Sequence, residues 1–170
     1  MDQIERSVAV GIGQDSHRFL SESGSKVCKI GGLPFPDLPG FDADSDGDVI
    51  LHAICNALSS ITSIPILGKL AIDLCHQSGI TDSRIYLERA LALFPDLEIN
   101  HVALSLEGSR PRLQTHIEAI CHKIAEILGI DSSQVGMTAT SGNNLTSFSK
   151  GEGLLCLAIV TATRTIKRKS

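Results

Sequence analysis

The sequence predicts an α+β fold, an α/β sandwich in which a four-stranded mixed sheet carries helices on one face and a small N-terminal hairpin is added. Strand-like and helix-like stretches follow one another in the order β-β-α-α-β-α-β-β. The chain has 170 residues, 42% of them hydrophobic, which is enough for one buried core. We therefore expect a single domain over residues 1–170.

Two short strands are predicted near the N-terminus. Residues 7–13 alternate small and β-branched side chains and end in Gly-x-Gly, which predicts a strand that runs into a loop. Residues 27–30 form a second, shorter stretch of this kind and end at a pair of glycines. The proline-rich residues 34–39 that follow are expected to be a loop.

Two helices are predicted in the middle of the chain. Ser45 and Asp48 have the Ser-x-x-Asp spacing of a capping box, so we expect a helix to begin at Ser45 and to end near residues 59–60. Asp82 has the position of an N-cap before a second apolar, helix-like stretch, which Pro95 ends.

The second half of the chain is expected to supply the rest of the sheet and one more helix. Residues 98–106 and 134–140 have strand patterns, and residues 113–128 have the spacing of an amphipathic helix. Residues 153–163 are almost all apolar, which predicts a central strand buried on both faces. The basic residues 164–170 are expected to be a disordered tail.

Composition argues against several classes of protein. The net charge is −4 and the pI is near 5.8, which does not fit a nucleic-acid-binding protein. The longest apolar run, residues 154–160, is far shorter than the roughly 18 residues of a membrane helix, and no secretory signal is visible. The five cysteines form no CxxC pair and fit a reducing compartment. We expect a cytoplasmic protein with neither a nucleic acid nor a membrane as partner.

Three side chains have the chemistry of a divalent-metal site. Asp15 and His17 are two residues apart in extended backbone, so both side chains point to the same side. His52 lies one turn into the first predicted helix. One carboxylate and two imidazoles leave the fourth position of a tetrahedral Zn²⁺ vacant, as in catalytic zinc sites. Asp48, four residues before His52, is expected to meet the other ring nitrogen of His52 or to serve elsewhere in the pocket.

Two further segments suit phosphate groups. The segment 40–48 leads into a helix N-terminus, which attracts anions, but its acidic side chains would repel a bare phosphate. A metal ion held by Asp15, His17 and His52 would reconcile the two. The polar turn 138–144 offers hydroxyls and amides to a diphosphate, with Lys150 as a cationic partner. Such a turn also occurs with no ligand at all.

Taken together, these segments resemble the 2-C-methyl-D-erythritol 2,4-cyclodiphosphate synthase family of non-mevalonate isoprenoid biosynthesis. The matching stretches follow the family's order along almost the whole chain. They are GIGQDSHRF (11–19), the Gly31-Gly32 turn, SDGDVILHAICNAL (45–58), GKL (68–70) with Asp73, TDSR (81–84), Pro111-Arg112, TATS (138–141) with Leu145, and GEG (151–153).

The resemblance implies a phosphorus–oxygen lyase that works as a homotrimer with active sites between neighbouring subunits. Similar proteins convert 4-diphosphocytidyl-2-C-methyl-D-erythritol 2-phosphate into 2-C-methyl-D-erythritol 2,4-cyclodiphosphate and CMP. The substrate's own 2-phosphate attacks, so no protein nucleophile is needed. The resemblance implies one Zn²⁺ per chain at Asp15, His17 and His52, and a second divalent cation, Mg²⁺ or Mn²⁺.

The resemblance also assigns the remaining site residues by position. Asp44 and Ser141 stand at catalytic positions, where the family has His and Thr. The substrate-binding positions are Ser16, Ser45, Gly68, Asp73, Pro111, Arg112, Leu113, Thr140, Gly142, Asn143 and Lys150.

Several pocket positions depart from the family. Asn143 stands for the Glu that holds the second ion, and Lys150 stands for Arg. Ile66 replaces an Asp, and residues 71–72 replace Phe-Pro. Two other functions therefore stay open. One is a catalytically idle, zinc-binding trimeric relative that binds a nucleotide or diphosphate, and the other is a zinc phosphohydrolase.

Overall fold

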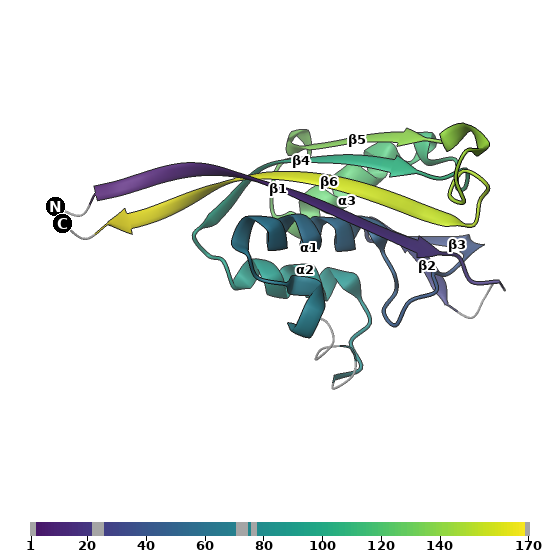
Figure 1. The fold of residues 1–170 in the computed structure, drawn as a ribbon, viewed down its shortest axis with the longest axis horizontal. Helices are drawn as coiled ribbons and strands as arrows, with labels where there is room; N and C mark the ends of the chain where they lie inside the picture. The colour runs from purple at the N-terminus through teal and green to yellow at the C-terminus, as the bar shows by residue number, and fades with distance from the viewer. Residues whose placement is uncertain (1–2, 22–25, 71–74, 76–77, 169–170) are drawn as a thin grey trace.

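The computed structural model describes residues 3–21, 26–70, 75 and 78–168 (Figure 1). The strands are β1 (Gln3–Arg18), β2 (Val27–Ile30), β3 (Leu33–Pro39), β4 (Leu97–Glu107), β5 (Val135–Thr140) and β6 (Gly153–Arg168). The α-helices are α1 (Val49–Thr62), α2 (Ser83–Ala92) and α3 (Ile117–Leu128). Shorter helical segments are Ile66–Leu70, Leu113–Thr115, Ser132–Gln134 and Gly142–Asn144.

The four-stranded sheet has the order β1-β6-β4-β5, and β2 and β3 form a separate hairpin (Figure 1). β4 and β5 are parallel, whereas the other pairs in the sheet are antiparallel, so the sheet is mixed as predicted. α1 packs on β1 and β6, and α3 packs on β5. Ile54 of α1 and Ile120 of α3 belong to one core with the inward side chains of the sheet. The predicted α+β class, the hairpin and the helix-covered face are confirmed.

Two glycines of β1 let the backbone of α1 lie directly on the strand. A Cβ atom at Gly13 would overlap the carbonyl oxygen of Ala53, and one at Gly11 would overlap that of Ala57. No side chain larger than glycine fits between strand and helix at these two positions. This contact fixes how far the start of α1 stands from the C-terminal half of β1, where Asp15 and His17 lie.

In the part of the chain that the structure describes, no helix covers the opposite face of the sheet (Figure 1). β6 is central, but it is buried on one face only: Cys156 and Ala158 are fully buried, whereas Leu157 and Ile159 are 38% and 44% exposed. The prediction of burial on both faces is therefore wrong. The exposed apolar side chains of this region, here called the open sheet face, are Val8, Val10, Ile12, Leu157 and Ile159.

Strands extend further than the sequence predicted. β1 continues to Arg18, so Asp15 and His17 lie on the strand itself and not after it. Residues 34–39, expected to be a loop, lie in β3, where Pro34 pairs with Lys29 and Phe35 pairs with Cys28. A proline is tolerated there because β3 is an edge strand of a two-stranded sheet.

The basic segment at the end of the chain is part of β6. Arg164 pairs with Ser7, and the pairing continues to Arg168 opposite Gln3. The predicted disordered tail is therefore wrong for residues 164–168, because the start of β1 provides a partner strand for them. Residues 169 and 170 lie outside the described part of the chain.

The first helix also differs at both ends from the prediction. α1 begins at Val49, and its N-cap is Asp48, whose carboxylate accepts hydrogen bonds from the amides of Ile50 and Leu51. Ser45 is not the cap. The helix ends at Thr62, beyond the predicted residues 59–60. Asp82 does cap α2 as predicted. Among the described residues, no helix is long and apolar enough to cross a membrane.

Candidate metal centre

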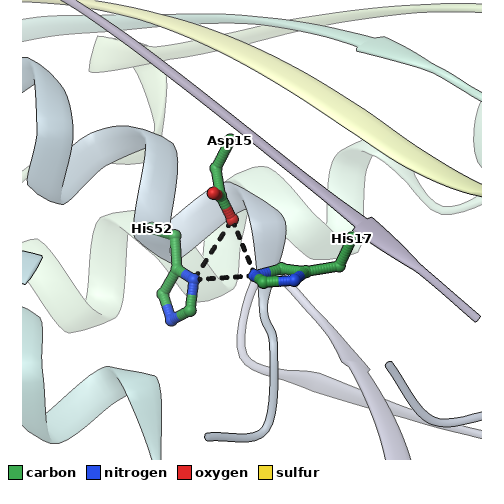
Figure 2. Close-up of side chains that lie close together, drawn as sticks. All are labelled: Asp15, His17 and His52. Atoms are coloured by element: carbon green, nitrogen blue, oxygen red, sulfur yellow. Dashed lines mark hydrogen bonds and ion pairs between the residues drawn. The ribbon is translucent and has the colours of Figure 1, made fainter. Parts of the chain in front are cut away.

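Asp15, His17 and His52 meet at one point between β1 and α1 (Figure 2). Asp15 Oδ2 lies 3.0 Å from His17 Nε2 and 3.1 Å from His52 Nδ1. The two imidazole nitrogens lie 3.2 Å apart. One atom of each side chain therefore occupies a corner of a nearly equilateral triangle.

The geometry of β1 and α1 explains why these side chains meet. Side chains of a strand alternate between faces, so Asp15 and His17 point toward α1 while Ser16, between them, is exposed on the other side. His52 lies in the first turn of α1, where its backbone amide bonds to the carbonyl oxygen of Asp48. The cap at Asp48 therefore determines where His52 stands.

The two imidazoles favour the ionised form of the Asp15 carboxyl group. Burial raises the pKa of Asp15, but the hydrogen bonds and charges of His17 and His52 outweigh it and lower this pKa to about 2. Burial alone would lower the pKa of His17, but the hydrogen bond and charge of Asp15 raise it above its ordinary value.

The outward nitrogen of each ring also has a protein partner. His52 Nε2 lies 2.8 Å from the hydroxyl of Ser83 and 3.3 Å from that of Ser45. The ring of His17 donates a hydrogen bond to the backbone carbonyl of Asp42. The sequence offered Asp48 as the partner of His52, and this is wrong, because the Asp48 carboxylate faces the amides of Gly31 and Gly32 instead.

The donor set fits a zinc ion. A carboxylate oxygen and two imidazole nitrogens are ligands that Zn²⁺ uses in catalytic sites, and three protein ligands leave one position for a substrate oxygen. The outward nitrogens are already satisfied, so the inward atoms are available for the metal. Within the described residues, this is the one group of three or more His, Cys, Asp or Glu side chains that converges in this way.

The triad opens into a cavity of about 560 Å³. Besides the triad, its walls include two other predicted site residues, Asp44 and Ser45. Asp44 is exposed and Ser45 is buried. The residues that line this cavity are Asp15, His17, Asp42, Ala43, Asp44, Ser45, His52, Leu67, Cys75 and Tyr86. With three carboxylates in its walls, the cavity suits an anionic ligand only when a cation is bound as well.

A second cavity, of about 260 Å³, lies at the ends of β4 and β5 and is lined by another set of predicted residues. Five predicted residues line it: Pro111, Arg112, Leu113, Thr140 and Ser141. It shares no lining residue with the triad cavity. A single chain thus presents two separate cavities that predicted site residues line.

The sequence model of the YgbB family matches residues 8–163. The chain belongs to the YgbB family. Its relatives include proteins named 2-C-methyl-D-erythritol 2,4-cyclodiphosphate synthase from Chlamydia muridarum and Chlamydia felis. The first is 52% identical over 153 residues, covering 89% of this chain and 86% of the relative. The second is 51% identical, covering 89% and 87%.

Solved structures of YgbB relatives share the fold. A 2C-methyl-D-erythritol-2,4-cyclodiphosphate synthase in its CDP-bound form has a TM-score of 0.79 at 26% identity, covering 91% of this chain and 99% of that one. The Plasmodium falciparum IspF in complex with CDP has a TM-score of 0.79 at 21% identity, covering 92% and 96%. The resemblance stated from the sequence and the predicted fold are both confirmed.

The other predicted site residues of this YgbB chain are dispersed around the two cavities. Gly142 and Asn143 lie in the short helical segment that follows Ser141, and Lys150 is exposed in the turn before β6. Ser16 and Gly68 line two further surface cavities. The cavity at Ser16 also touches His17, whereas the cavity at Gly68 includes no residue of the triad. Predicted residue Asp73 and residues 71–72 lie outside the described part of the chain.

Some residues of the site were not predicted. Ser83 contacts the ring of His52, and Leu67, Cys75 and Tyr86 line its cavity. Ile66, which stands for a pocket Asp in the family, is buried (1% exposed) and does not line this cavity. Only the neighbouring Leu67 does. The sequence signal for Ser83 was the TDSR stretch, which was interpreted as a helix start and as a match to the family, with no role for Ser83 in the site.

Proposed function

We propose that this chain is a 2-C-methyl-D-erythritol 2,4-cyclodiphosphate synthase. The observation that carries the proposal is the convergence of Asp15, His17 and His52 in a cavity, in a chain that is 52% identical to a relative with this name. The reaction converts 4-diphosphocytidyl-2-C-methyl-D-erythritol 2-phosphate into the cyclic diphosphate and CMP. We also propose that it takes place in the cytoplasm, in keeping with five free cysteines.

The chemistry needs positioning more than a reactive side chain. An oxygen of the substrate's 2-phosphate bonds to the β-phosphorus, and the bond from that phosphorus to the oxygen bridging it to the α-phosphorus breaks, so CMP leaves with the electron pair. Both partners belong to one molecule, and holding them in line lowers the barrier. No protein group has to be acylated or phosphorylated.

The triad would hold one Zn²⁺ per chain. When bound, the zinc and a second ion, Mg²⁺ or Mn²⁺, would supply positive charge that stabilises the diphosphate as its charge shifts in the reaction. Asp15, His17 and His52 fix the position of the first charge. Asp44 and Ser45, in the wall of the same cavity, would border the phosphates.

The second cavity would hold the cytidine end of the substrate. Pro111, Arg112 and Leu113 form one wall, and Thr140 and Ser141 offer hydroxyls to the diphosphate from the end of β5. Gly142, Asn143 and Lys150, in the adjoining turns, would lie along the phosphates. The relative with bound CDP supports this choice of ligand.

We propose a homotrimer in which each active site lies between neighbouring subunits. Two observations support it. The metal and cytidine cavities share no lining residue within one chain, as expected when the cavity of a neighbouring subunit completes each site. The open sheet face exposes Val8 by 71%, Val10 by 64% and Ile12 by 63%, and an apolar sheet face of this kind is stable in water when another subunit covers it.

One assay tests the proposed function. Purified protein is incubated with the cytidyl substrate, Zn²⁺ and Mg²⁺, and the products are followed by phosphorus NMR. Cyclic diphosphate and CMP in equal amounts support the synthase. Release of inorganic phosphate would identify a zinc phosphohydrolase, and unchanged substrate that nevertheless binds would identify a catalytically idle relative.

A further inference from the structure

Beyond the three candidate ligands, a buried hydroxyl lies against the outward nitrogen of His52. Ser83, the first residue of α2, is fully buried, and its Oγ lies 2.8 Å from His52 Nε2. His52 itself is 8% exposed. A serine hydroxyl has one hydrogen to donate and can also accept, so its role toward His52 depends on where that hydrogen goes.

The hydrogen of Ser83 goes to Asp46. Asp46 Oδ1 accepts from the Ser83 hydroxyl and from the backbone amide of Asp48 at 3.2 Å. Asp46 Oδ2 accepts from the backbone amide of Ser83 at 3.1 Å and lies 3.4 Å from the ammonium of Lys29. Among the described residues, each hydrogen-bond or ion-pair partner of this carboxylate is therefore a donor, so the carboxylate oxygens act as acceptors.

Because Ser83 gives its one hydrogen to Asp46, it can only accept from His52. His52 Nε2 must then carry a proton, and Nδ1 is the ring nitrogen left to bind a metal ion. Nδ1 is the atom that faces Asp15 and His17 (Figure 2). Ser45 is compatible with this order, since its hydroxyl oxygen, 3.3 Å from Nε2, has two lone pairs and can accept from both Nε2 and the Gly47 amide.

The network is held by elements far apart in the sequence. Lys29, on β2, lies 3.4 Å from Asp46 and 3.2 Å from Asp82, the N-cap of α2. The backbone amide of Asp46 donates to the carbonyl oxygen of Thr81 at 2.8 Å. The start of α2 is thus tied to the loop before α1, and this tie sets Ser83 against His52.

We propose that Ser83 and Asp46 are positioning residues that hold the ring of His52 with Nε2 as donor and Nδ1 toward the metal position. The inference rests on the proposed metal site and adds two residues to it that are neither ligands nor substrate contacts. Partners of this kind fix ring orientation, and their loss typically weakens metal binding by roughly 10- to 100-fold.

The test compares zinc affinity, by competition with a chromogenic chelator, in the wild-type chain, Ser83→Ala and Asp46→Asn. We expect both variants to bind zinc roughly 10- to 100-fold more weakly. The control is Ser59→Ala, which also loses a helix serine with two hydrogen bonds, to the carbonyl of Cys55 and from the amide of Ile66, outside this network. It should bind zinc as the wild type does.

A second readout separates positioning from general stability. Nitrogen-15 NMR of the metal-free wild type should show His52 Nε2 carrying a proton, and an unprotonated Nε2 overturns the proposal. Wild-type zinc affinity in Ser83→Ala also overturns the proposal. If His52→Ala still binds one zinc at full affinity, the proposed metal site itself is wrong. If zinc binding is lost in His52→Ala but unchanged in Ser83→Ala, the metal site stands and only the positioning role is refuted.

Discussion

The carboxylate of Asp48 accepts a hydrogen bond of 2.7 Å from the backbone amide of Gly32. The same fully buried side chain accepts from the amides of Gly31, Ile50 and Leu51. One carboxylate thereby joins the turn of the β2–β3 hairpin to the first turn of α1. Since that turn also carries His52, the hairpin and the metal centre share a single anchor.

Replacing Asp48 should therefore destabilise the whole domain. Asp48→Ala leaves four amides without their acceptor, among them the two that the N-cap satisfies. We expect a loss of about 3 kcal/mol in the free energy of unfolding, measured by urea titration of the metal-free protein. The matched control is Asp131→Ala, which removes the capping box of the exposed segment Ser132–Gln134 and should cost far less. Equal losses in the two variants would contradict the anchor.

Zinc content should depend on His52. His52→Ala removes one of three converging donors, and two ligands do not hold Zn²⁺ against solvent at micromolar protein. Metal analysis after gel filtration should give about one zinc per wild-type chain, as expected for one closed triad, and none for the variant. His122→Ala, on the exposed side of α3, is the control and should retain its zinc. A full equivalent of zinc in His52→Ala would refute the triad.

The sequence predicted the contacts of the site that depend on nearby residues and missed those that join elements far apart in the chain. Asp15 and His17 could be paired because strand alternation is a local rule, and His52 could be added because it follows a helix start. Ser83 was missed as a partner of His52, and Asp46 as the partner of Ser83, because these contacts depend on how α2 docks, and nothing local in the sequence encodes that. The role of Asp48 was missed for the same reason, since Gly31 and Gly32 lie on another element.

For the fold as well, local patterns were predicted and contacts between distant elements were not. The strand and helix patterns predicted the mixed sheet, but the apolar run of β6 did not reveal that only one face of this strand is buried in the chain. Leu157 and Ile159 are apolar and yet exposed in a single subunit. Likewise, the basic residues 164–168 have a solvent-like composition, and only the partner strand β1 makes them part of the sheet.

The stability of the metal-free protein should depend on pH through Asp15. Its pKa falls from 3.8 in the unfolded chain to about 2 in the folded one, so its contribution is present above about pH 4 and is lost as the pH falls toward 2. The shift corresponds to about 2 kcal/mol. The pKa of His17 is raised, so its contribution is present below its unfolded value of 6.5 and is lost as the pH rises through the folded value.

The comparison that isolates this effect uses Asp15→Asn. The difference in unfolding free energy between wild type and variant, both stripped of metal, should be largest between about pH 4 and 6 and should shrink toward pH 3. Urea titrations at each pH measure it. A difference that grows as the pH falls below about 4 has the wrong sign for a lowered carboxyl pKa.

Asp44→His should preserve or raise the rate of the proposed synthase. Asp44 is exposed in the wall of the triad cavity, where a carboxylate repels the phosphates that a histidine could bond. Steady-state rates with the cytidyl substrate, at saturating Zn²⁺ and Mg²⁺, measure the effect. A rate that drops tenfold or more would mean that Asp44 has a catalytic task of its own in this chain.

Ile12→Glu should break the proposed trimer. Ile12 is 63% exposed at the centre of the open sheet face, opposite Ile159 of β6, so a carboxylate there would be buried without a partner once a second subunit covers the face. Light scattering after gel filtration should give a trimer for the wild type and smaller species for the variant, with synthase activity lost as the shared site comes apart. Leu145→Glu changes a side chain that is 84% exposed outside this face and should remain trimeric. A trimeric, active Ile12→Glu protein would show that the subunits meet through another surface.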